Sequence, residues 1–338
     1  MVEATHNSFN ASDRSLFSII KREIHFKALD AGFSAQQVGK LDIIISEMTS
    51  NLHKYAKGGE MLMGILKDGD NEYIELICLD EGPGMYDPLR MLADGFSSTN
   101  TMGHGLGSMK RLSDYFDIYS AKGWGTVVLS RLYKNPLPHY QSSNTGVEIR
   151  PIVVAKTGEK ISGDGHYYKQ NDQYVKLLVA DGLGHGPEAN LAVNEAVRAF
   201  RQCAYNSPVE IIRDMHASIR KTRGIVGTVV VFDLVHKKFS IAGVGNIATK
   251  LLTHGLTKSQ LPYNGIIGHN IPNTMNDQEL TFSEYQQIVL CSDGIKSRWD
   301  IGKYLGINRC DLSIIAAAIY KDYARKTDDM SVIITKIK

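Results

Sequence analysis

Two glycine-rich stretches, Asp80-Glu81-Gly82-Pro83-Gly84 and Gly103-His104-Gly105-Leu106-Gly107, decide how the first half of this chain is interpreted. The alternating apolar run at residues 74–79 predicts a strand that carries Asp80 to a sheet edge, where its carboxylate can accept a hydrogen bond from an exocyclic amine. The glycines of the first stretch permit a tight turn beneath a base. The helical pattern after Gly107 places the second stretch at a helix N-terminus, where free N–H groups bind phosphate. Together they predict an ATP site, with the polar interval between them as a lid.

A predicted helix upstream carries polar side chains beside an apolar stripe. Its apolar positions recur at helical spacing between Leu41 and Tyr55. Glu47 and Asn51 are four residues apart, and a helical wheel places them with Lys54 along one edge of this stripe. A carboxylate, an amide and an amine so placed would line the floor of a cleft. Taken alone, however, the spacing favours an ordinary amphipathic helix with polar flanks.

The length of 338 residues predicts two domains rather than one. Residues 1–134 show helices, then a hairpin, a further helix and a second hairpin, which predicts an α/β sandwich with a largely antiparallel sheet. Residues 135–146 combine prolines with small polar residues and read as a linker. Residues 147–338 alternate short strands with helices, which predicts two stacked sheets flanked by helices. The expected fold class is therefore α/β (α+β) in both domains.

Composition disfavours several kinds of partner. The formal net charge is +2, and charges of both signs are interspersed, so neither nucleic acid nor a membrane is expected as a partner. No apolar run approaches the ~18 residues of a membrane span, and the first residues lack the apolar core of a signal peptide. The four cysteines show no CxxC spacing and read as thiols of a reducing compartment. We therefore expect a cytoplasmic protein.

The second half contains aspartates that follow or precede glycine near predicted strand ends. Each Asp-Gly pair is by itself common turn chemistry. Four carboxylates that converged would instead suit two divalent cations that prefer oxygen ligands, Mn²⁺ or Mg²⁺. Two metals sharing a bridging water would supply a hydroxide nucleophile for a phosphoryl group. We favour this metal site over the turn interpretation; its candidate carboxylates are Asp164, Asp181, Asp293 and those of the pair Asp328-Asp329.

Other catalytic groups are less well supported. No cysteine lies in a phosphate-cradling loop, and no serine occupies a strand-turn-helix elbow. His185 fits two roles equally: a proton donor or phosphate ligand, and a loop residue with an unusual backbone angle. The stretch Gly243-Val244-Gly245-Asn246 is interpreted as a structural turn.

The motifs of the first half resemble the GHKL superfamily of ATP-binding domains, and most closely the serine/threonine kinases of bacterial partner-switching systems and the stressosome switch kinase. The likeness covers nearly all of residues 10–132. It implies that Glu47 acts as general base on a serine or threonine hydroxyl, that Asn51 coordinates Mg²⁺ and that Asp80 holds adenine. The ATP- and Mg²⁺-binding residues so implied are Asn51, Lys54, Asp80, Gly82, Gly84, Gly103, His104, Gly105, Leu106, Gly107 and Thr126.

The second half is similar to metal-dependent PPM-type serine/threonine phosphatases of the stage II sporulation (SpoIIE-like) branch. The likeness spans roughly residues 147–338. It implies that the metal ligands are Asp164, Asp181, the Gly182 carbonyl, Asp293 and Asp328, with Asp181 also counted as catalytic. We find no arginine that matches the phosphate-binding one of the eukaryotic members. The turn ending at Asn246 also differs from the usual Gly-His pattern.

These resemblances imply a bifunctional regulator that phosphorylates and dephosphorylates STAS-type anti-sigma-factor antagonists or stressosome-like proteins. A downstream sigma-factor or output-enzyme regulator is a further expected partner. The alternative is an active phosphatase whose first domain only senses nucleotide and binds a partner. An ATPase of the gyrase or chaperone type would need transducer regions for which the chain has no space. Glu47 and Asn51 favour the kinase interpretation.

Overall fold

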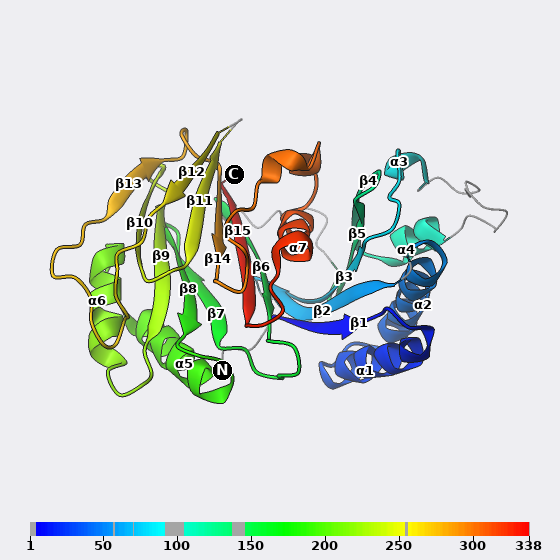
Figure 1. The fold of residues 1–338 in the computed structure, drawn as a ribbon, viewed down its shortest axis with the longest axis horizontal. Coiled ribbons are helices and arrows are strands. Elements are labelled where there is room, and N and C mark those ends of the chain that lie inside the picture. Colours follow the sequence, from blue (N-terminus) through cyan, green and yellow to red (C-terminus); the bar gives the residue numbers. More distant parts are fainter. Residues whose placement is uncertain are drawn as a thin grey trace. The chain divides into compact units, whose positions relative to one another are not determined.

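The computed structural model describes residues 5–56, 58–69, 71–91, 105–136, 146–253 and 256–337. These residues form two compact units, which we treat separately (Figure 1). The N-terminal unit comprises residues 5–136 and 303–318, and the C-terminal unit comprises residues 146–302 and 319–337. Both units combine helices with antiparallel sheets, which confirms the predicted fold class. Most of the expected linker, and residues 92–102 of the expected lid between Gly84 and Gly103, lie outside the described residues.

The N-terminal unit is a five-stranded antiparallel sheet with the helices of residues 17–51 and 105–112 on one face (Figure 1) and residues 303–318 on the other. Its strand order is β1-β2-β3-β5-β4. The elements are β1 (His6–Asn10), the 3-10 helix η1 (Arg14–Leu16), α1 (Phe17–Asp30), α2 (Ala35–Asn51), the π-helix η2 (Leu52–Ala56), β2 (Gly59–Asp68), β3 (Asn71–Asp80), α3 (Pro88–Met91), α4 (Gly105–Leu112), β4 (Tyr115–Ala121) and β5 (Gly125–Tyr133).

Local sequence explains the helices of this unit. Ser34 begins α2 with a capping box in which its hydroxyl accepts from Gln37 N and the Gln37 side chain accepts from Ser34 N. The apolar stripes of α1, α2 and α4 pack against β2, β3 and β5 to form one core. The two predicted hairpins, β2–β3 and β4–β5, are confirmed. Strand β1 was not predicted, because its five residues show no strong alternation.

A row of five residues crosses the other face of this sheet. His6, Gly64, Glu75, Arg131 and Tyr115 are successive cross-strand partners on β1, β2, β3, β5 and β4. Gly64 is central to the row, since a Cβ there would lie 2.9 Å from His6 Nε2. Its missing side chain lets His6 Nε2 reach Glu75 Oε1 at 3.1 Å, while Arg131 Nε donates to Glu75 Oε2 at 2.6 Å. The charged side chains of this row are buried.

Residues 303–318 add hydrogen bonds to the buried charged side chains of this row. Arg131 donates two hydrogen bonds of 2.7 Å to the Asp311 carboxylate and a third, of 2.9 Å, to the Ser313 hydroxyl. The backbone N–H of Asp311 donates to Asp117 on β4. Glu75 and Asp311 thus share one guanidinium, a bidentate geometry that favours arginine over lysine. We call Glu75, Arg131, Asp311 and Ser313 the Arg131 network.

The Arg131 network predicts a pH dependence of stability. Burial alone would raise the pKa of Glu75, but the Arg131 charge and the His6 contact lower it to about 2. Unfolded glutamate has a pKa of about 4.3. Because the folded pKa is the lower one, this stabilisation is complete above about pH 4.3 and is lost as the pH falls through about 2. We expect denaturant titrations over this window to show a smaller loss of stability in Glu75→Gln than in the wild type; parallel pH profiles would contradict it.

The C-terminal unit contains two five-stranded antiparallel sheets, with orders β13-β10-β9-β8-β7 and β12-β11-β14-β15-β6. Its elements are β6 (Val147–Val154), β7 (Asp164–Gln170), β8 (Tyr174–Gly182), α5 (Pro187–Gln202), α6 (Pro208–Ser218), β9 (Ile225–Asp233), β10 (Lys238–Val244), β11 (Ala248–Thr253), β12 (Leu256–Gln260), β13 (Gln278–Thr281), β14 (Gln287–Cys291) and β15 (Met330–Ile337). Three further helices, η3 (Ile301–Lys303), η4 (Ile307–Arg309) and α7 (Leu312–Tyr323), follow β14 in the chain.

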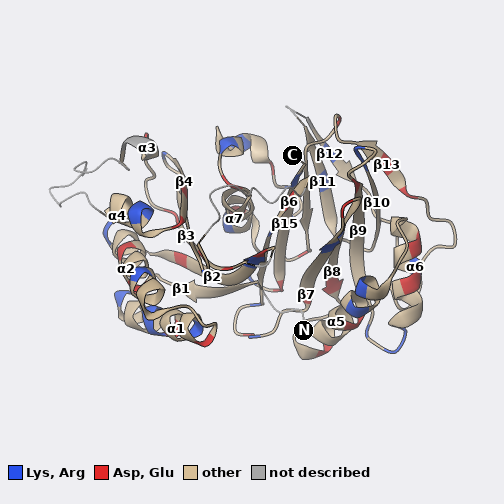
Figure 2. Ribbon diagram, turned by 180° about the vertical axis from the view of Figure 1, so that it is seen from behind, with Lys and Arg blue, Asp and Glu red and all other residues tan. Residues whose placement is uncertain are grey.

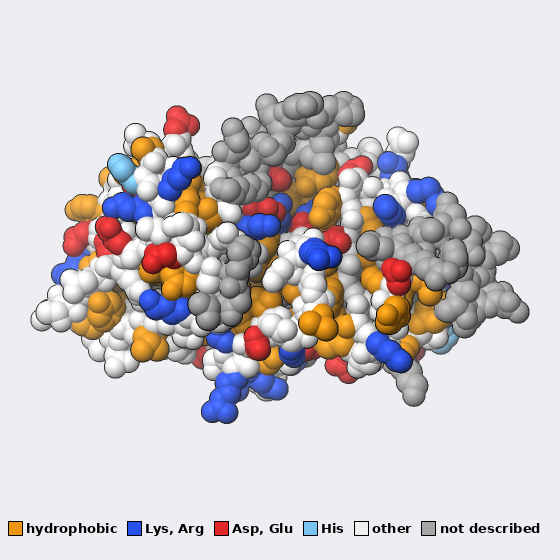
Figure 3. All heavy atoms as spheres, turned by 90° about the horizontal axis from the view of Figure 1, so that it is seen from above, with side chains coloured by type: hydrophobic (Ala, Val, Ile, Leu, Met, Phe, Trp, Pro, Cys, Tyr) orange, Lys and Arg blue, Asp and Glu red, His pale blue; other side chains and the backbone are white. Residues whose placement is uncertain are grey.

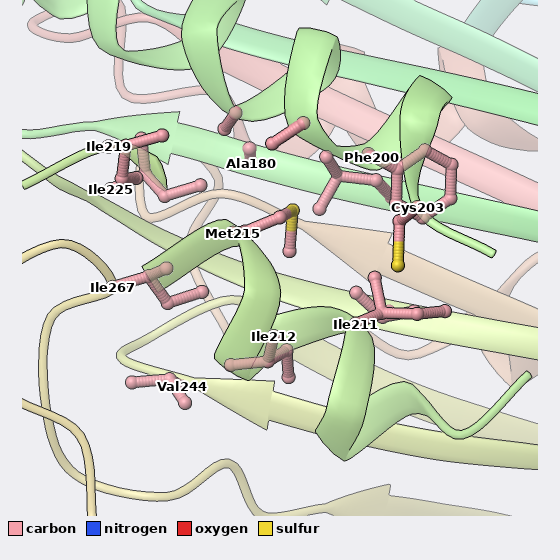
Figure 4. Close-up of a cluster of buried hydrophobic side chains, with 14 of the residues drawn as sticks. Ala180, Phe200, Cys203, Ile211, Ile212, Met215, Ile219, Ile225, Val244 and Ile267 are labelled. Carbon is pink, nitrogen blue, oxygen red and sulfur yellow. The ribbon is translucent and has the colours of Figure 1, made fainter. Parts of the chain in front are cut away.

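Two hydrophobic cores hold this unit together. One core joins the facing sides of the two sheets and includes Val230, Phe232 and Ile333. In the other, α5 and α6 pack on the first sheet through side chains such as Phe200 and Met215 (Figures 1 and 4). Two stacked sheets with flanking helices were predicted, and the structure has this arrangement. Strands β7, β12 and β13 were not predicted.

The surface and the cysteines add three observations. Lys and Arg are interspersed with Asp and Glu on α1 and α2 (Figure 2), and both signs occur together on the face shown in Figure 3. Within the described part of the chain, none of the helices has the length and apolar character needed to cross a bilayer. Cys78, Cys203 and Cys291 are buried and free, and Cys310 is free and partly buried.

Candidate functional site

The N-terminal unit contains a cavity of about 210 Å³ between α2, α4 and the ends of β3 and β5. It brings together several residues that the sequence predicted to bind nucleotide, from segments separated by up to 75 positions. The lining residues are Met48, Asn51, Leu52, Tyr55, Cys78, Asp80, Pro83, Gly84, Met85, Met91, Gly105, Leu106, Met109, Thr126 and Val128. Most of them are apolar, as expected for a pocket that encloses a base and is oriented by a few polar groups.

Asp80 is the main polar group at the strand-end side of this cavity. Its Oδ1 accepts from Gly82 N at 2.7 Å and from Thr126 N at 3.2 Å. A Cβ on Gly84, where φ is +68°, would lie 2.0 Å from the Ala121 carbonyl oxygen, so only glycine allows this turn. The turn after β3 and the start of β5 are therefore both hydrogen-bonded to the Asp80 carboxylate, which lines the cavity at the end of β3.

The opposite side of the cavity is formed by α2 and the start of α4. A Cβ on Gly105 would lie 2.9 Å from Glu47 Oε2 and 3.7 Å from Asn51 Oδ1. Gly105, at the start of α4, therefore faces the two polar residues of α2. Gly107 is buried within α4 and does not line the cavity, and Gly103 and His104 lie outside the described residues.

Lys54 takes a different place from the one that the helical wheel predicted. It lies in the π-helix η2 and lines a separate groove with Arg14 and Lys21, between α1 and α2. The wheel assumed a regular α-helix, whereas a π-turn holds more residues per turn and rotates the side chains that follow. The structure therefore does not place Lys54 among the residues that line the cavity.

Gly125→Ala is expected to impair this site. Gly125 has a φ of +115°, and an added Cβ would lie 2.1 Å from the Asp80 carbonyl oxygen, so backbone must move. We expect a loss of about 1–3 kcal/mol in stability and weaker ATP binding. Gly123→Ala is the matched control, since Gly123 also has positive φ, +77°, but has nothing within 4 Å of the added Cβ. Thermal melts and nucleotide titrations of both variants test this; equal effects would contradict the steric explanation.

The second candidate site is a cluster of aspartates in the C-terminal unit. Asp164 at the start of β7 is the cross-strand partner of Asp181 near the end of β8. Asp293 follows β14, and Asp328 precedes β15. The sequence placed these aspartates at strand ends, and the structure confirms this for both sheets, although Asp164 begins a strand rather than ending one.

The electrostatics of the cluster show mutual repulsion. Burial, followed by the charges of Asp164, Asp293 and Asp328, raises the pKa of Asp181 to about 10. Burial also raises the pKa of Asp164 to about 8, against a hydrogen bond from Ser292 that lowers it. Asp164 Oδ2 is buried without a hydrogen-bond partner. A divalent cation would supply a counter-charge to carboxylates placed this closely.

This donor set fits hard cations such as Mg²⁺ or Mn²⁺, because it consists of carboxylate oxygens. Among the described residues, no three His, Cys, Asp or Glu side chains already have the arrangement of a metal site. Metal binding by Asp164, Asp181, Gly182, Asp293 and Asp328 therefore stays a prediction.

Three residues near the cluster were not assigned from the sequence. Asn246 Nδ2 donates to Asp293 Oδ2 at 3.0 Å, so the turn interpreted as structural reaches a predicted ligand. Glu159 Oε1 pairs with His185 Nδ1 at 2.5 Å. Asp329 is buried beside Asp328 and bonds to backbone rather than facing solvent. Only Asp329 gave a signal in the sequence, by its position in a pair of adjacent aspartates.

Comparisons with known proteins bear on both sites. A model of the histidine kinase-like ATPase domain matches residues 20–131. The serine/threonine-protein kinase RsbT of Bacillus subtilis (strain 168) is 33% identical over 101 residues, which are 30% of this chain and 76% of RsbT. The chain belongs to the RsbT family. The RsbT likeness falls on the part of the chain that was predicted to be a GHKL-type kinase domain, and this prediction of family is confirmed.

The second half has different relatives. A model of stage II sporulation protein E (SpoIIE) matches residues 171–338. The phosphoserine phosphatase RsbX of Bacillus subtilis (strain 168) is 25% identical over 156 residues, which are 45% of this chain and 76% of RsbX. The chain therefore joins an RsbT-like kinase module to a SpoIIE-like, PPM-type phosphatase domain, as the sequence motifs predicted.

Two solved structures are similar to part of this chain. A chain from "The bacterial stressosome: a modular system that has been adapted to control secondary messenger signaling" is 29% identical, with a TM-score of 0.52, and covers 56% of this chain and 99% of that one. RsbX in complex with magnesium has a TM-score of 0.50 and 22% identity, and covers 57% of this chain and 96% of RsbX. The second likeness shows a shared fold.

Proposed function

We propose that this RsbT-family chain is a bifunctional regulator that phosphorylates and dephosphorylates serine or threonine on STAS-type partner proteins. The observation that carries the proposal is the presence of two separate polar sites on one chain. One is the cavity where Asp80 and Asn51 lie at opposite sides, and the other is the aspartate cluster. The kinase and phosphatase relatives support the assignment of one activity to each site.

In the kinase half, Asp80 would hold the adenine amine, and Asn51 would hold Mg²⁺ beside the phosphates. The free N–H groups at the start of α4 would bind the phosphates. Glu47 is half-buried next to Gly105 and would accept the proton of the partner's hydroxyl. This role needs a carboxylate close to the phosphate cradle, and the contact with Gly105 supports it.

In the phosphatase half, Asp164, Asp181, Asp293 and Asp328 would hold two divalent cations, either Mn²⁺ or Mg²⁺. When bound, such cations supply a hydroxide nucleophile at neutral pH and neutralise the phosphoryl oxygens. The carboxylates of this chain would hold the cations in place, and Asn246 would orient Asp293 through its hydrogen bond. His185, oriented by Glu159, is placed to assist proton transfer or phosphate binding.

Two single substitutions separate the activities. Glu47→Ala is expected to abolish transfer of label from γ-labelled ATP to a purified STAS partner, while Mn²⁺-dependent hydrolysis of the phosphorylated partner continues. Asp181→Ala is expected to do the reverse, with hydrolysis reduced more than about 100-fold and label transfer retained. If either substitution removed both activities in folded protein, two independent sites would be excluded.

The same assay tests the alternative function. If the wild-type protein binds ATP but transfers no label to any STAS partner, the RsbT-like module is a nucleotide sensor that binds a partner. The cavity would then serve nucleotide-dependent partner binding rather than phosphoryl transfer, and only the phosphatase would be catalytic. Partner capture that depends on ATP, with intact phosphatase activity, would identify that case.

A further inference from the structure

Asp329 has an environment unlike that of the other aspartates in the cluster. Only 3% of the residue is exposed. Its Oδ1 accepts from Lys156 N at 2.9 Å, and its Oδ2 accepts from Gly163 N at 2.8 Å. Both carboxylate oxygens are therefore engaged by backbone N–H donors, whereas its neighbour Asp328 accepts only the N–H of Asp329 among the hydrogen bonds of the described residues.

The bond to Gly163 fixes the two strands that carry Asp164 and Asp181. Gly163 directly precedes Asp164, and its carbonyl oxygen accepts from Gly182 N at 3.0 Å. Gly182 directly follows Asp181. A Cβ on Gly163 would lie 3.0 Å from Asp329 Oδ2 and 2.7 Å from the Ala189 side chain, so the close approach requires glycine.

The backbone of Asp329 contacts the remaining two ligand segments. Its N–H donates to Asp328 Oδ1 at 2.9 Å. A Cβ on Gly294, the residue after Asp293, would lie 1.9 Å from the Asp329 carbonyl oxygen, so this turn packs directly on Asp329. Three of the four candidate-ligand segments therefore contact Asp329 directly, and the fourth, at Asp181, is joined to it through Gly163.

The donor count explains why a carboxylate occupies this position despite the nearby negative charges. An ionised carboxylate offers an acceptor on each oxygen. An asparagine of the same shape has one acceptor oxygen and would direct its amino group at the second backbone N–H. A buried donor left without an acceptor is costly. The two backbone N–H groups therefore select aspartate over asparagine.

We propose that Asp329 is a positioning residue for the divalent cations of the phosphatase site, distinct from the ligand Asp328. Asp329 sets the spacing of the ligand segments through Gly163, Lys156 and Gly294 without binding metal itself. This inference rests on the proposed phosphatase function and assigns a new role within that site. Groups that orient metal ligands typically change metal affinity by about 10–100-fold when they are removed.

The test compares Mn²⁺ binding by wild-type, Asp329→Asn and Asp329→Ala proteins. Calorimetric titration with Mn²⁺ alone, well below the melting temperature, gives the dissociation constant, and hydrolysis of a phosphorylated STAS partner gives kcat and its Mn²⁺ dependence. We expect the dissociation constant to rise about 10-fold or more in Asp329→Asn and further in Asp329→Ala. At saturating Mn²⁺, Asp329→Asn should recover most of the wild-type kcat, because the ligands themselves remain.

Asp233→Asn is the matched control. Asp233 Oδ1 accepts two backbone N–H groups, those of Val235 and His236, at the far end of the sheet from Asp181. Its substitution should leave the Mn²⁺ dissociation constant unchanged. Asp328→Asn is the comparison for a direct ligand and should not recover at saturating Mn²⁺.

The outcomes distinguish the positioning role of Asp329 from direct metal ligation and from failure of the proposed phosphatase function. A dissociation constant for Asp329→Asn within about twofold of the wild type overturns the positioning role, since the expected change is at least 10-fold. Failure to recover at saturating Mn²⁺, as in Asp328→Asn, overturns it in favour of direct ligation. If a variant is too unstable to titrate, hydrogen exchange in wild-type protein decides: Mn²⁺ should slow exchange at Gly163 and Lys156, and no change overturns the role. A wild-type protein that neither binds Mn²⁺ nor hydrolyses the substrate rejects the proposed phosphatase itself.

Discussion

Arg131→Met is expected to lower the free energy of unfolding of the N-terminal unit by about 3–5 kcal/mol. Arg131 is 2% exposed and is the shared cation of Glu75 and Asp311. Methionine has similar bulk but takes the guanidinium away from two buried carboxylates, so that Glu75 keeps only its contacts with His6 and Ser313. The cost of burying these carboxylates without the shared cation, more than the lost hydrogen bonds, sets the size of the effect. Chemical denaturation followed by the fluorescence or circular dichroism of the protein measures it.

Two controls make this prediction specific. Arg198→Met removes an exposed ion pair with Glu195, for which we expect a loss below about 1 kcal/mol. Neutralising the whole network, with Glu75→Gln and Asp311→Asn added to Arg131→Met, should recover much of the loss, because no buried charge then remains unpaired. A loss in Arg131→Met no larger than that in Arg198→Met would show that the Arg131 network contributes little.

Asp181→Asn is expected to change stability and activity in opposite directions. Because the folded pKa of Asp181 is raised to about 10, the metal-free fold must keep a proton on this carboxyl that the unfolded chain releases above about pH 3.9, and this penalty grows up to about pH 10. Replacing the ionisable carboxyl with a neutral amide should therefore stabilise the metal-free protein at pH 7 by about 1 kcal/mol or more. The same change removes a predicted ligand, so phosphatase activity should fall more than about 100-fold.

Metal titration provides the second readout for Asp181→Asn. Mn²⁺ at 100 times its dissociation constant should add about 2.7 kcal/mol to the stability of the wild type, and much less to that of the variant at the same concentration. Thermal melts with and without EDTA measure both effects. If Asp181→Asn destabilised the metal-free protein, the repulsion within the aspartate cluster would have been overestimated.

The elements that the sequence predicted best have strong local patterns. The stripe of α2 and the alternation of β3 and β8 follow from periodicity that short windows contain. Strand β1 has no such pattern. It pairs with β2, where Gly64 leaves room for His6 to reach Glu75 two strands away. A contact of that kind depends on sheet order and register, which local periodicity does not encode.

The sites show the same division. Asp80, Asn51, Gly105 and Thr126 were predicted and line one cavity, because glycine spacing and strand ends restrict where a phosphate and a base can bind. Lys54 was placed by a regular helical wheel, and the π-helix changes its direction. Asp311 gave no signal, since its partners lie 180 residues or more earlier in the chain. Ion pairs between residues so far apart in the chain cannot be predicted from local sequence motifs.

Because residues 303–318 belong to the N-terminal unit, the chain cannot be divided at the linker into two fragments that each contain a complete unit. A fragment that stops at the linker would carry Glu75 and Arg131 but not Asp311 or Ser313, and would expose a charged strip that evolved to be buried. A fragment that starts at the linker would carry this stretch without the sheet it covers. Expression of separate halves would then report on damaged parts rather than on two autonomous enzymes. A cut at residue 318 or later, rather than at the linker, would be needed to keep the Arg131 network with its own sheet.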